Sequence, residues 1–346
     1  MHDSAVEKLW RFGKLRKASS KKQVFMHTAP PPKKALNAWL SKYPSEFGNY
    51  GHLLLEEKQA ADANLQRDFV PYFESAHLDA RGCFHRLARI SLHPDAGDIG
   101  CDAQYPGSLP LTARKGLFGE VMSGMMSETY DFVGKHEYLI PVFLFRNHED
   151  AGQYIYTLSR DATRTREVLG RKGDDFIAIV VDEEDNVTRF IAGEAKWRGN
   201  WSPSVLNTVM LGDKIDDPAD KTKRIHNGKG VWYEVNRALP VPLGLEQLHA
   251  VLEECEPDKF AKVIASLDRI LARRNPDPVE RTDMILLVGG PPAKRNPGQA
   301  LLPWETVPDE YKAGRDLQVV ELLIADGDSL INTIYASLWA KEAALA

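Results

Sequence analysis

DFIAIVVDEEDNVTRFIAGEAK, residues 175–196, is the most informative segment of the sequence. It opens with an apolar, β-branched run over Asp175–Val181, and a second such run covers Val187–Lys196 and ends in charged residues. Between the two lies Asp182–Asn186 (DEEDN), whose side chains favour turns. Two β-branched runs joined by a short polar segment predict a β-hairpin.

Helical and strand-like patterns alternate on both sides of this hairpin. Thr112 is expected to cap a helix that begins at residues 110–112. Further single helices are expected at 53–65, 150–169, 202–211 and 329–344, and a pair of helices broken at Pro257 is expected at 245–274. Strands are expected at 137–145, 284–288 and 319–325. This alternation predicts an α/β or α+β fold around a mixed central sheet flanked by helices.

Changes in composition divide the chain into three regions. Residues 1–34 form a basic N-terminal arm that ends in a proline-rich linker. A mixed region covers residues 35–109. The remainder, residues 110–346, is expected to form the core, with a helical insertion at 244–274 and a closing strand and helix at 316–344.

The composition is that of a globular chain, with 346 residues of which 43% are hydrophobic and 27% are charged, and this excludes disorder along the whole length. No run approaches the ~18 to 20 apolar residues of a membrane helix. The N-terminus has charges but no apolar centre, unlike a secretory signal. The three cysteines, Cys83, Cys101 and Cys255, are far apart. This usage is typical of a reduced protein, so we expect a cytoplasmic one.

The net charge of −5 is unevenly distributed along the chain. Residues 1–34 contain nine Lys or Arg and two acids, a charge of +7, so the rest of the chain carries −12. A basic arm on an acidic body can contact phosphate groups or an acidic partner protein. A solvated tail without a partner is the alternative.

Three charged side chains of the predicted hairpin suggest a reactive site. Glu194 and Lys196 are two residues apart on one strand, so they leave the same face. The turn brings Asp175, at the start of the other strand, back beside them. Two converging carboxylates suit Mg²⁺ or Mn²⁺. A lysine beside such an ion can orient or help deprotonate a water, and it can stabilise charge on a phosphate.

The glycine before this pair, Gly193, would let a ligand approach the strand closely. Charged residues at the end of an otherwise apolar strand cost desolvation unless they have a use. Two other interpretations are open. Glu194 and Lys196 can instead form an exposed salt bridge, worth about 0–1 kcal/mol. Asp175 can be a turn or cap residue.

This arrangement resembles the PD-(D/E)XK nuclease superfamily. The signature of that family is an Asp at the start of one strand, followed by Glu-x-Lys on the next strand. The matching segments here are Gly173–Phe176 (GDDF) and Gly193–Lys196 (GEAK). The resemblance implies a restriction-endonuclease-like core, with a helix, a meander of three strands, a second helix and a further strand. The helix at 202–211 would then be the second core helix.

The resemblance implies roles for four residues. Asp175 and Glu194 would ligate Mg²⁺ or Mn²⁺, and Lys196 would orient the attacking water. Many members add a glutamate from the preceding core helix, for which Glu120 is the candidate as a further metal ligand. Asp174 is the alternative to Asp175, and Glu120 can instead be a solvent-facing helix residue. The implied activity is metal-dependent hydrolysis of DNA phosphodiesters.

A closer resemblance is to the HamA-type effector nucleases of the Hachiman anti-phage system. It involves the two segments above and the late strand Val320–Asp326 (VELLIAD), which precedes a closing helix. It implies a DNA substrate and a superfamily 2 helicase partner of the HamB type. Activity would be held in check until the helicase senses a lesion or foreign DNA. The alternative function is an inactive nuclease-fold adaptor that docks a helicase or another ATPase.

A second cluster of possible ligands precedes the core. Cys83, His85, His93 and Cys101 include the soft donors that a structural zinc site uses. Because their spacing lacks a tight second pair, we interpret them as ordinary core and loop residues.

Overall fold

The computed structural model of the protein describes residues 27–88, 105–107, 109–145, 174–237, 241–272, 274, 276–303 and 305–340. Most of the expected basic arm, residues 1–26, lies outside this part of the chain, as does the helix expected at 150–169. The Cys and His residues at positions 83–101 also lie outside the described side chains.

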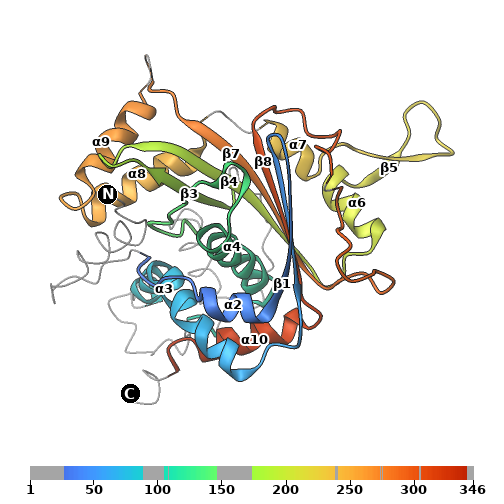
Figure 1. Cartoon of the computed structure of the whole chain (residues 1–346), viewed down its shortest axis with the longest axis horizontal. Coiled ribbons are helices and arrows are strands. Elements are labelled where there is room, and N and C mark those ends of the chain that lie inside the picture. Colours follow the sequence, from blue (N-terminus) through green and yellow to red (C-terminus); the bar gives the residue numbers. More distant parts are fainter. Residues whose placement is uncertain are drawn as a thin grey trace, which may run out of the picture.

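A six-stranded mixed sheet forms the centre of the protein (Figure 1). From one edge to the other, its strands are β1 (Leu40–Phe47), β2 (Tyr50–Glu57), β8 (Asp316–Leu323), β7 (Glu280–Gly289), β4 (Val187–Arg198) and β3 (Phe176–Val181). The four inner strands are parallel, and the two outer strands are antiparallel to their neighbours. A separate small sheet pairs β5 (Lys214–Asp216) with β6 (Arg224–His226), and Figure 1 shows it projecting from the body.

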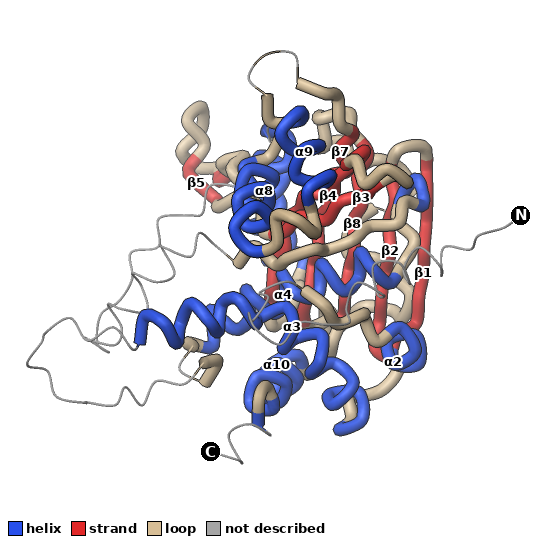
Figure 2. The backbone as a smooth tube through the Cα atoms, turned by 90° about the vertical axis from the view of Figure 1, so that its left-hand side faces the viewer, coloured by secondary structure: helices blue, strands red, loops and turns tan. Residues whose placement is uncertain are grey.

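Helices cover both faces of the sheet (Figure 1 and Figure 2). One face, the α4 face, carries α2 (Lys33–Trp39), α3 (Ala63–Ala88), α4 (Leu111–Thr129) and α10 (Gly327–Ser337). The opposite one, the α7 face, carries α6 (Pro203–Leu211), α7 (Val231–Arg237), α8 (Leu243–Cys255) and α9 (Ala261–Ile270). A short 3-10 helix, η1 (Val133–Lys135), follows α4.

Side chains of the central strands alternate between these two layers. On β7, Met284 and Leu286 pack on the α4 face, whereas Ile285 and Leu287 pack on the α7 face. Strands covered on both sides bury nearly every side chain, which explains their continuous apolar runs. Among the described residues, none of the helices combines the length and apolarity that crossing a bilayer requires.

Several elements expected from the sequence are present. β3 and β4 form the predicted hairpin, with Phe176 opposite Gly193. Helix α6 matches the helix expected at 202–211, and the Ser202 side chain caps it by accepting a hydrogen bond from the Val205 amide. Helices α8 and α9 form the expected pair, β7 and β8 are the expected late strands, and α10 is the closing helix. The prediction of a mixed sheet flanked by helices is confirmed.

The prediction of a helix at 53–65 is wrong for the first half of this segment. Residues 50–57 form β2, and α3 begins only at Ala63. A short apolar run such as the leucines at 53–55 fits a buried helix or a buried strand equally well. Pairing with β8, in which Tyr50 lies opposite Leu317, selects the strand. Residues 40–57 therefore share one sheet with strands of the 110–346 region.

The prediction of a strand at 137–145 is also wrong. This segment meets the sheet through one bridge, in which Leu139 and Ile179 exchange backbone hydrogen bonds of 2.8 and 2.9 Å. Pro141 lacks the N–H that a longer ladder would use. Thr112 is not the cap of α4, because Pro110 occupies the N-cap position without a side-chain hydrogen bond.

Candidate active site

The β3–β4 hairpin brings Asp175, Glu194 and Lys196 together on the α7 face. Asp175 directly precedes β3, and its N–H donates to the Gly193 carbonyl at 2.7 Å, which places it beside Glu194. Residues of β4 alternate between faces, so Glu194 and Lys196 point away from Ala195, which packs on the α4 face. The juxtaposition expected from the hairpin is present, and the chemical roles of the three residues stay predictions.

Lys196 contacts both carboxylates. Its Nζ lies 2.7 Å from Oε2 of Glu194 and 3.7 Å from Oδ2 of Asp175. The same Asp175 oxygen accepts a hydrogen bond from the Ala195 amide at 2.9 Å. The exposed fractions of the side chains are 28% for Lys196, 20% for Asp175 and 10% for Glu194. The three side chains therefore form a compact charged group with limited access to solvent.

Burial and neighbouring charge both affect the ionisation of this group. The pKa of Glu194 is raised to about 8, first by burial and then by the charge of Asp175, whereas Lys196 acts in the opposite direction. Burial lowers the pKa of Lys196, but the two carboxylates outweigh it, so the net shift of that pKa is upward. The raised pKa of Glu194 means that a second negative charge beside Asp175 is disfavoured, and a cation bound here would relieve this repulsion.

Glu234 on α7 is a further charged residue near this group. Its charge contributes to the upward pKa shifts of both Glu194 and Lys196. No pattern in the sequence indicates this contribution. Helix α7 has only seven residues, and it reaches the sheet because Val231 and Trp232 are buried in the core on that face.

The structure does not bring Glu120 together with the other three predicted site residues. Helix α4 lies on the opposite face of the sheet, and a Cβ added to Gly119 would lie 3.4 Å from Cβ of Ala195. Glu120 is buried rather than solvent-facing. Burial is the main cause of the raised pKa values of Tyr105 and Tyr335, and the charge of Glu120 adds to both. Glu120 therefore lies near these tyrosines.

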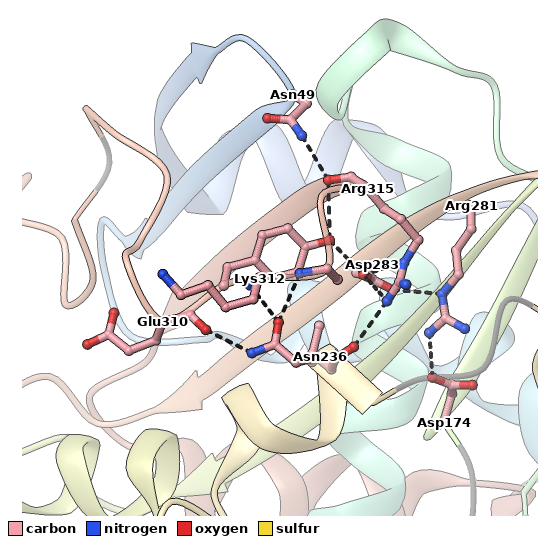
Figure 3. Close-up of polar contacts among 11 residues, drawn as sticks. Asn49, Asp174, Asn236, Arg281, Asp283, Glu310, Lys312 and Arg315 are labelled. Atoms are coloured by element: carbon pink, nitrogen blue, oxygen red, sulfur yellow. Dashed lines mark hydrogen bonds and ion pairs between the residues drawn. The ribbon is translucent and has the colours of Figure 1, made fainter.

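Asp174 and Asp175 point to different partners. Oδ1 of Asp174 accepts a hydrogen bond from Nη2 of Arg281 at 3.1 Å (Figure 3), whereas Asp175 faces Ala195 and Lys196. Burial raises the pKa of Asp174, and Arg281 acts in the opposite direction. Of the two aspartates, Asp175 is the one that belongs to the charged group.

Gly193 serves packing rather than ligand approach. A Cβ at this position would lie 2.8 Å from the carbonyl oxygen of Met284 and 2.8 Å from a ring carbon of Phe176. Neighbouring side chains therefore fill the space beside this glycine. The expectation that Gly193 opens the strand to a ligand is wrong, because the residue faces the packed α4 layer.

Asp175 and Glu194 are the residues that could hold a divalent cation. Within the described part of the chain, no group of three or more His, Cys, Asp or Glu side chains is arranged to hold a metal ion. Two carboxylates are nevertheless sufficient for Mg²⁺, which commonly takes one or two from the protein and completes its octahedron with waters and substrate phosphates. A divalent cation would also offset the repulsion between the two carboxylates, which contributes to the raised pKa of Glu194.

No protein-family model matches this chain, and no curated protein matches it either. The function is therefore inferred from the residues of the site and from the motifs that they form.

Proposed function

We propose that this protein is a Mg²⁺-dependent DNA nuclease with a PD-(D/E)XK-type, restriction-endonuclease-like core. The observation that carries the proposal is the position of Lys196 Nζ, which lies within 4 Å of a carboxylate oxygen of Asp175 and of Glu194. These residues follow the order Asp, then Glu-x-Lys, on two paired strands. A mixed sheet with helices on both faces is compatible with such a core, although of the expected three-stranded meander only β3 and β4 are strands and residues 137–145 contribute a single bridge.

Each of these residues has a distinct role in the proposed reaction. Asp175 and Glu194 would hold the cation, which when bound would help to activate a water and would neutralise charge on the scissile phosphate. Lys196 orients this water and stabilises the negative charge that builds on the phosphate. The water oxygen bonds to phosphorus as the P–O ester bond breaks, the attacking water gives up one proton to the solvent, and the leaving oxygen takes up one proton from the solvent.

The resemblance to HamA-type effectors extends the proposal to a biological setting. A superfamily 2 helicase of the HamB type would be the partner, and the nuclease would act on DNA in the cytoplasm as part of anti-phage defence. The low exposure of Glu194 is compatible with a site that becomes accessible only in such a complex.

Plasmid cleavage tests this function. Supercoiled plasmid is incubated with Mg²⁺ or Mn²⁺ and the wild-type protein, Lys196→Ala or Lys115→Ala, with and without the protein encoded by the adjacent gene. Lys115 is a matched control, since it is another partly buried lysine in an ion pair, 2.8 Å from Asp328. We expect cleavage by the wild type and by Lys115→Ala, and none by Lys196→Ala.

The second candidate function is an inactive adaptor with the same fold that docks a helicase or another ATPase. The observation that favours it is the close pair of Lys196 and Glu194, which partly balances its own charge. Well-folded protein that cuts DNA under none of these conditions, with or without the neighbouring protein, would favour this candidate over the nuclease.

A further inference from the structure

A buried arginine holds Asp174, the chain neighbour of Asp175 (Figure 3). The side chain of Arg281, on β7, is only 4% exposed, and it donates to Asp174 across 3.1 Å. Its guanidinium also lies over the ring of Phe190, 5.6 Å from the ring centroid. Arg281 is on the α7 face, as is Glu194, so the anchor of Asp174 shares the face of the candidate site.

Arg281 is itself fixed by Asp283. Its Nε donates to Oδ1 of Asp283 at 2.6 Å. The other oxygen of Asp283 accepts hydrogen bonds from the Tyr311 hydroxyl at 2.7 Å and from Nε of Arg315 at 2.9 Å. Figure 3 shows Arg281 and Arg315 converging on Asp283. Two guanidinium groups and two carboxylates balance one another, and Arg281 is thereby confined to one orientation.

Burial of these ion pairs is weak evidence that they stabilise the fold. Desolvation of buried charges offsets much of their attraction, and apolar residues of the same volume often stabilise a fold equally well. A guanidinium does offer a planar and preorganised set of donors, which fixes the orientation of the carboxylate that it binds. We infer that these ion pairs instead fix the backbone conformation of Asp174, the residue that precedes Asp175 in the chain.

Arg189 offers a comparison on the α4 face. This arginine is also buried, and it binds Glu280 and Asp316, the latter at 2.9 Å. The two carboxylates lie at the starts of β7 and β8, and neither adjoins a residue of the candidate site. The two arginine clusters are chemically alike, but only that of Arg281 binds a neighbour of Asp175.

We propose that Arg281 is a positioning residue that, through Asp174, fixes the backbone from which Asp175 reaches Ala195 and Lys196. The catalytic meaning of this inference rests on the proposed nuclease function. Release of Asp174 lets Asp175 turn away from the Ala195 amide. Misplacement of a ligand by about 1 Å is enough to slow an enzymatic reaction about 100-fold.

The amide proton of Ala195 reports the position of Asp175 without metal or DNA, because it donates to Oδ2 of that residue. Hydrogen exchange at Ala195 is followed by NMR in the wild type, Asp174→Ala, Asp175→Ala and Asp316→Ala. We expect Asp174→Ala to speed this exchange about tenfold, the order of one lost hydrogen bond, as Asp175→Ala does. Asp316→Ala, which breaks the comparable ion pair with Arg189, should leave the exchange rate of the Ala195 amide unchanged. Exchange at Ile191, on the same strand, corrects for changes in overall stability.

Unchanged exchange at Ala195 in Asp174→Ala would overturn the positioning role. If that variant does not fold, Asp174→Asn replaces it, because asparagine loses the charge but keeps an acceptor oxygen. Asp174→Asn should speed exchange at Ala195 by a smaller factor, and unchanged exchange in this variant would again overturn the positioning role. In cleavage assays, Asp174→Ala should lower kcat with little change in KM for DNA. Faster exchange at Ala195, together with no cleavage by the wild type either alone or with the neighbouring protein, would reject the nuclease function and leave the positioning role in place.

Discussion

The amino group of Lys196 lies 2.7 Å from a carboxylate oxygen of Glu194, two residues earlier on the same strand. Alternate side chains of a strand share a face, so the Glu-x-Lys spacing itself makes this contact possible. Asp175 adds a second carboxylate from the neighbouring strand, 3.7 Å from the same ammonium. A charged group of this kind directly after the apolar run Phe190–Gly193 of β4 departs from the local pattern, and such departures are expected at functional sites.

Mg²⁺ should stabilise the wild-type protein through Asp175 and Glu194. A ligand that binds only the folded state raises the free energy of unfolding, by about 2.7 kcal/mol at 100 times its Kd. Glu194→Gln should abolish this gain, because it removes one carboxylate and keeps the shape of the side chain. Thermal unfolding with and without Mg²⁺ measures the effect, with Glu184→Gln in the exposed turn as the control. Equal stabilisation of Glu194→Gln and wild type would mean that the ion binds elsewhere.

Glu120→Gln should leave the stabilisation by Mg²⁺ intact. Its helix packs on the face of the sheet opposite to Glu194, and its charge acts on Tyr105 and Tyr335. The same unfolding assay makes the comparison with Glu194→Gln direct. A loss of the Mg²⁺ effect in Glu120→Gln would show that this glutamate reaches the ion, as the family resemblance implies.

Gly193→Ala should destabilise the fold by about 1–3 kcal/mol, the usual range for overpacking a core. The added Cβ would overlap with the Met284 backbone and the Phe176 ring, both at 2.8 Å. Gly199→Ala is the matched control in the next segment, since no described atom lies within 4 Å of its added Cβ. Urea unfolding midpoints compare the two variants. A midpoint for Gly193→Ala as high as that of Gly199→Ala would contradict the packing role of Gly193.

The stability of the protein should fall below about pH 6.5 because of His77. This side chain is fully buried between the hydroxyls of Tyr105 and Tyr335, and burial lowers its pKa from 6.5 to about 3. Between these values the unfolded chain takes up a proton that the folded protein does not, so the free energy of unfolding decreases by about 1.4 kcal/mol per pH unit as the pH falls. The stabilisation is complete above pH 6.5.

Urea unfolding between pH 7 and pH 4 measures this dependence. His77→Gln removes the titrating group, so its unfolding free energy should fall less steeply with decreasing pH than that of the wild type. Identical slopes for the two proteins would assign the acid sensitivity to other groups.

Local patterns were sufficient to predict the central part of this fold. The hairpin of β3 and β4 follows from two β-branched runs and a polar turn between them, and the convergence of Asp175 with Glu194 and Lys196 follows from the hairpin. None of these inferences needs information from distant parts of the chain, because the residues concerned lie within 22 positions of one another.

Features that depend on distant partners could not be predicted in this way. Leucines 53–55 form a strand only because β8 pairs with them, and the sequence contains no local sign of that pairing. Prediction of the candidate site is limited in the same way, because some of its contacts join residues that are distant in the sequence. Arg281 meets Asp174 across more than a hundred residues, and Glu234 approaches Glu194 only because a short helix packs on the same face. Glu120 lies on a helix that was correctly located, but its position on the opposite face depends on how that helix packs.

The most direct test of the central claim is the rate of Mg²⁺-dependent plasmid cleavage by Lys196→Ala and by the double variant Glu194→Ala/Lys196→Ala, beside the wild type. Circular dichroism and unfolding midpoints confirm that each protein is folded. We predict that wild-type protein cuts DNA, alone or with the proposed helicase partner, and that both variants are at least about 100-fold slower, as expected when transition-state charge stabilisation is lost. Cleavage by the folded double variant at the wild-type rate would contradict the assignment of the active site.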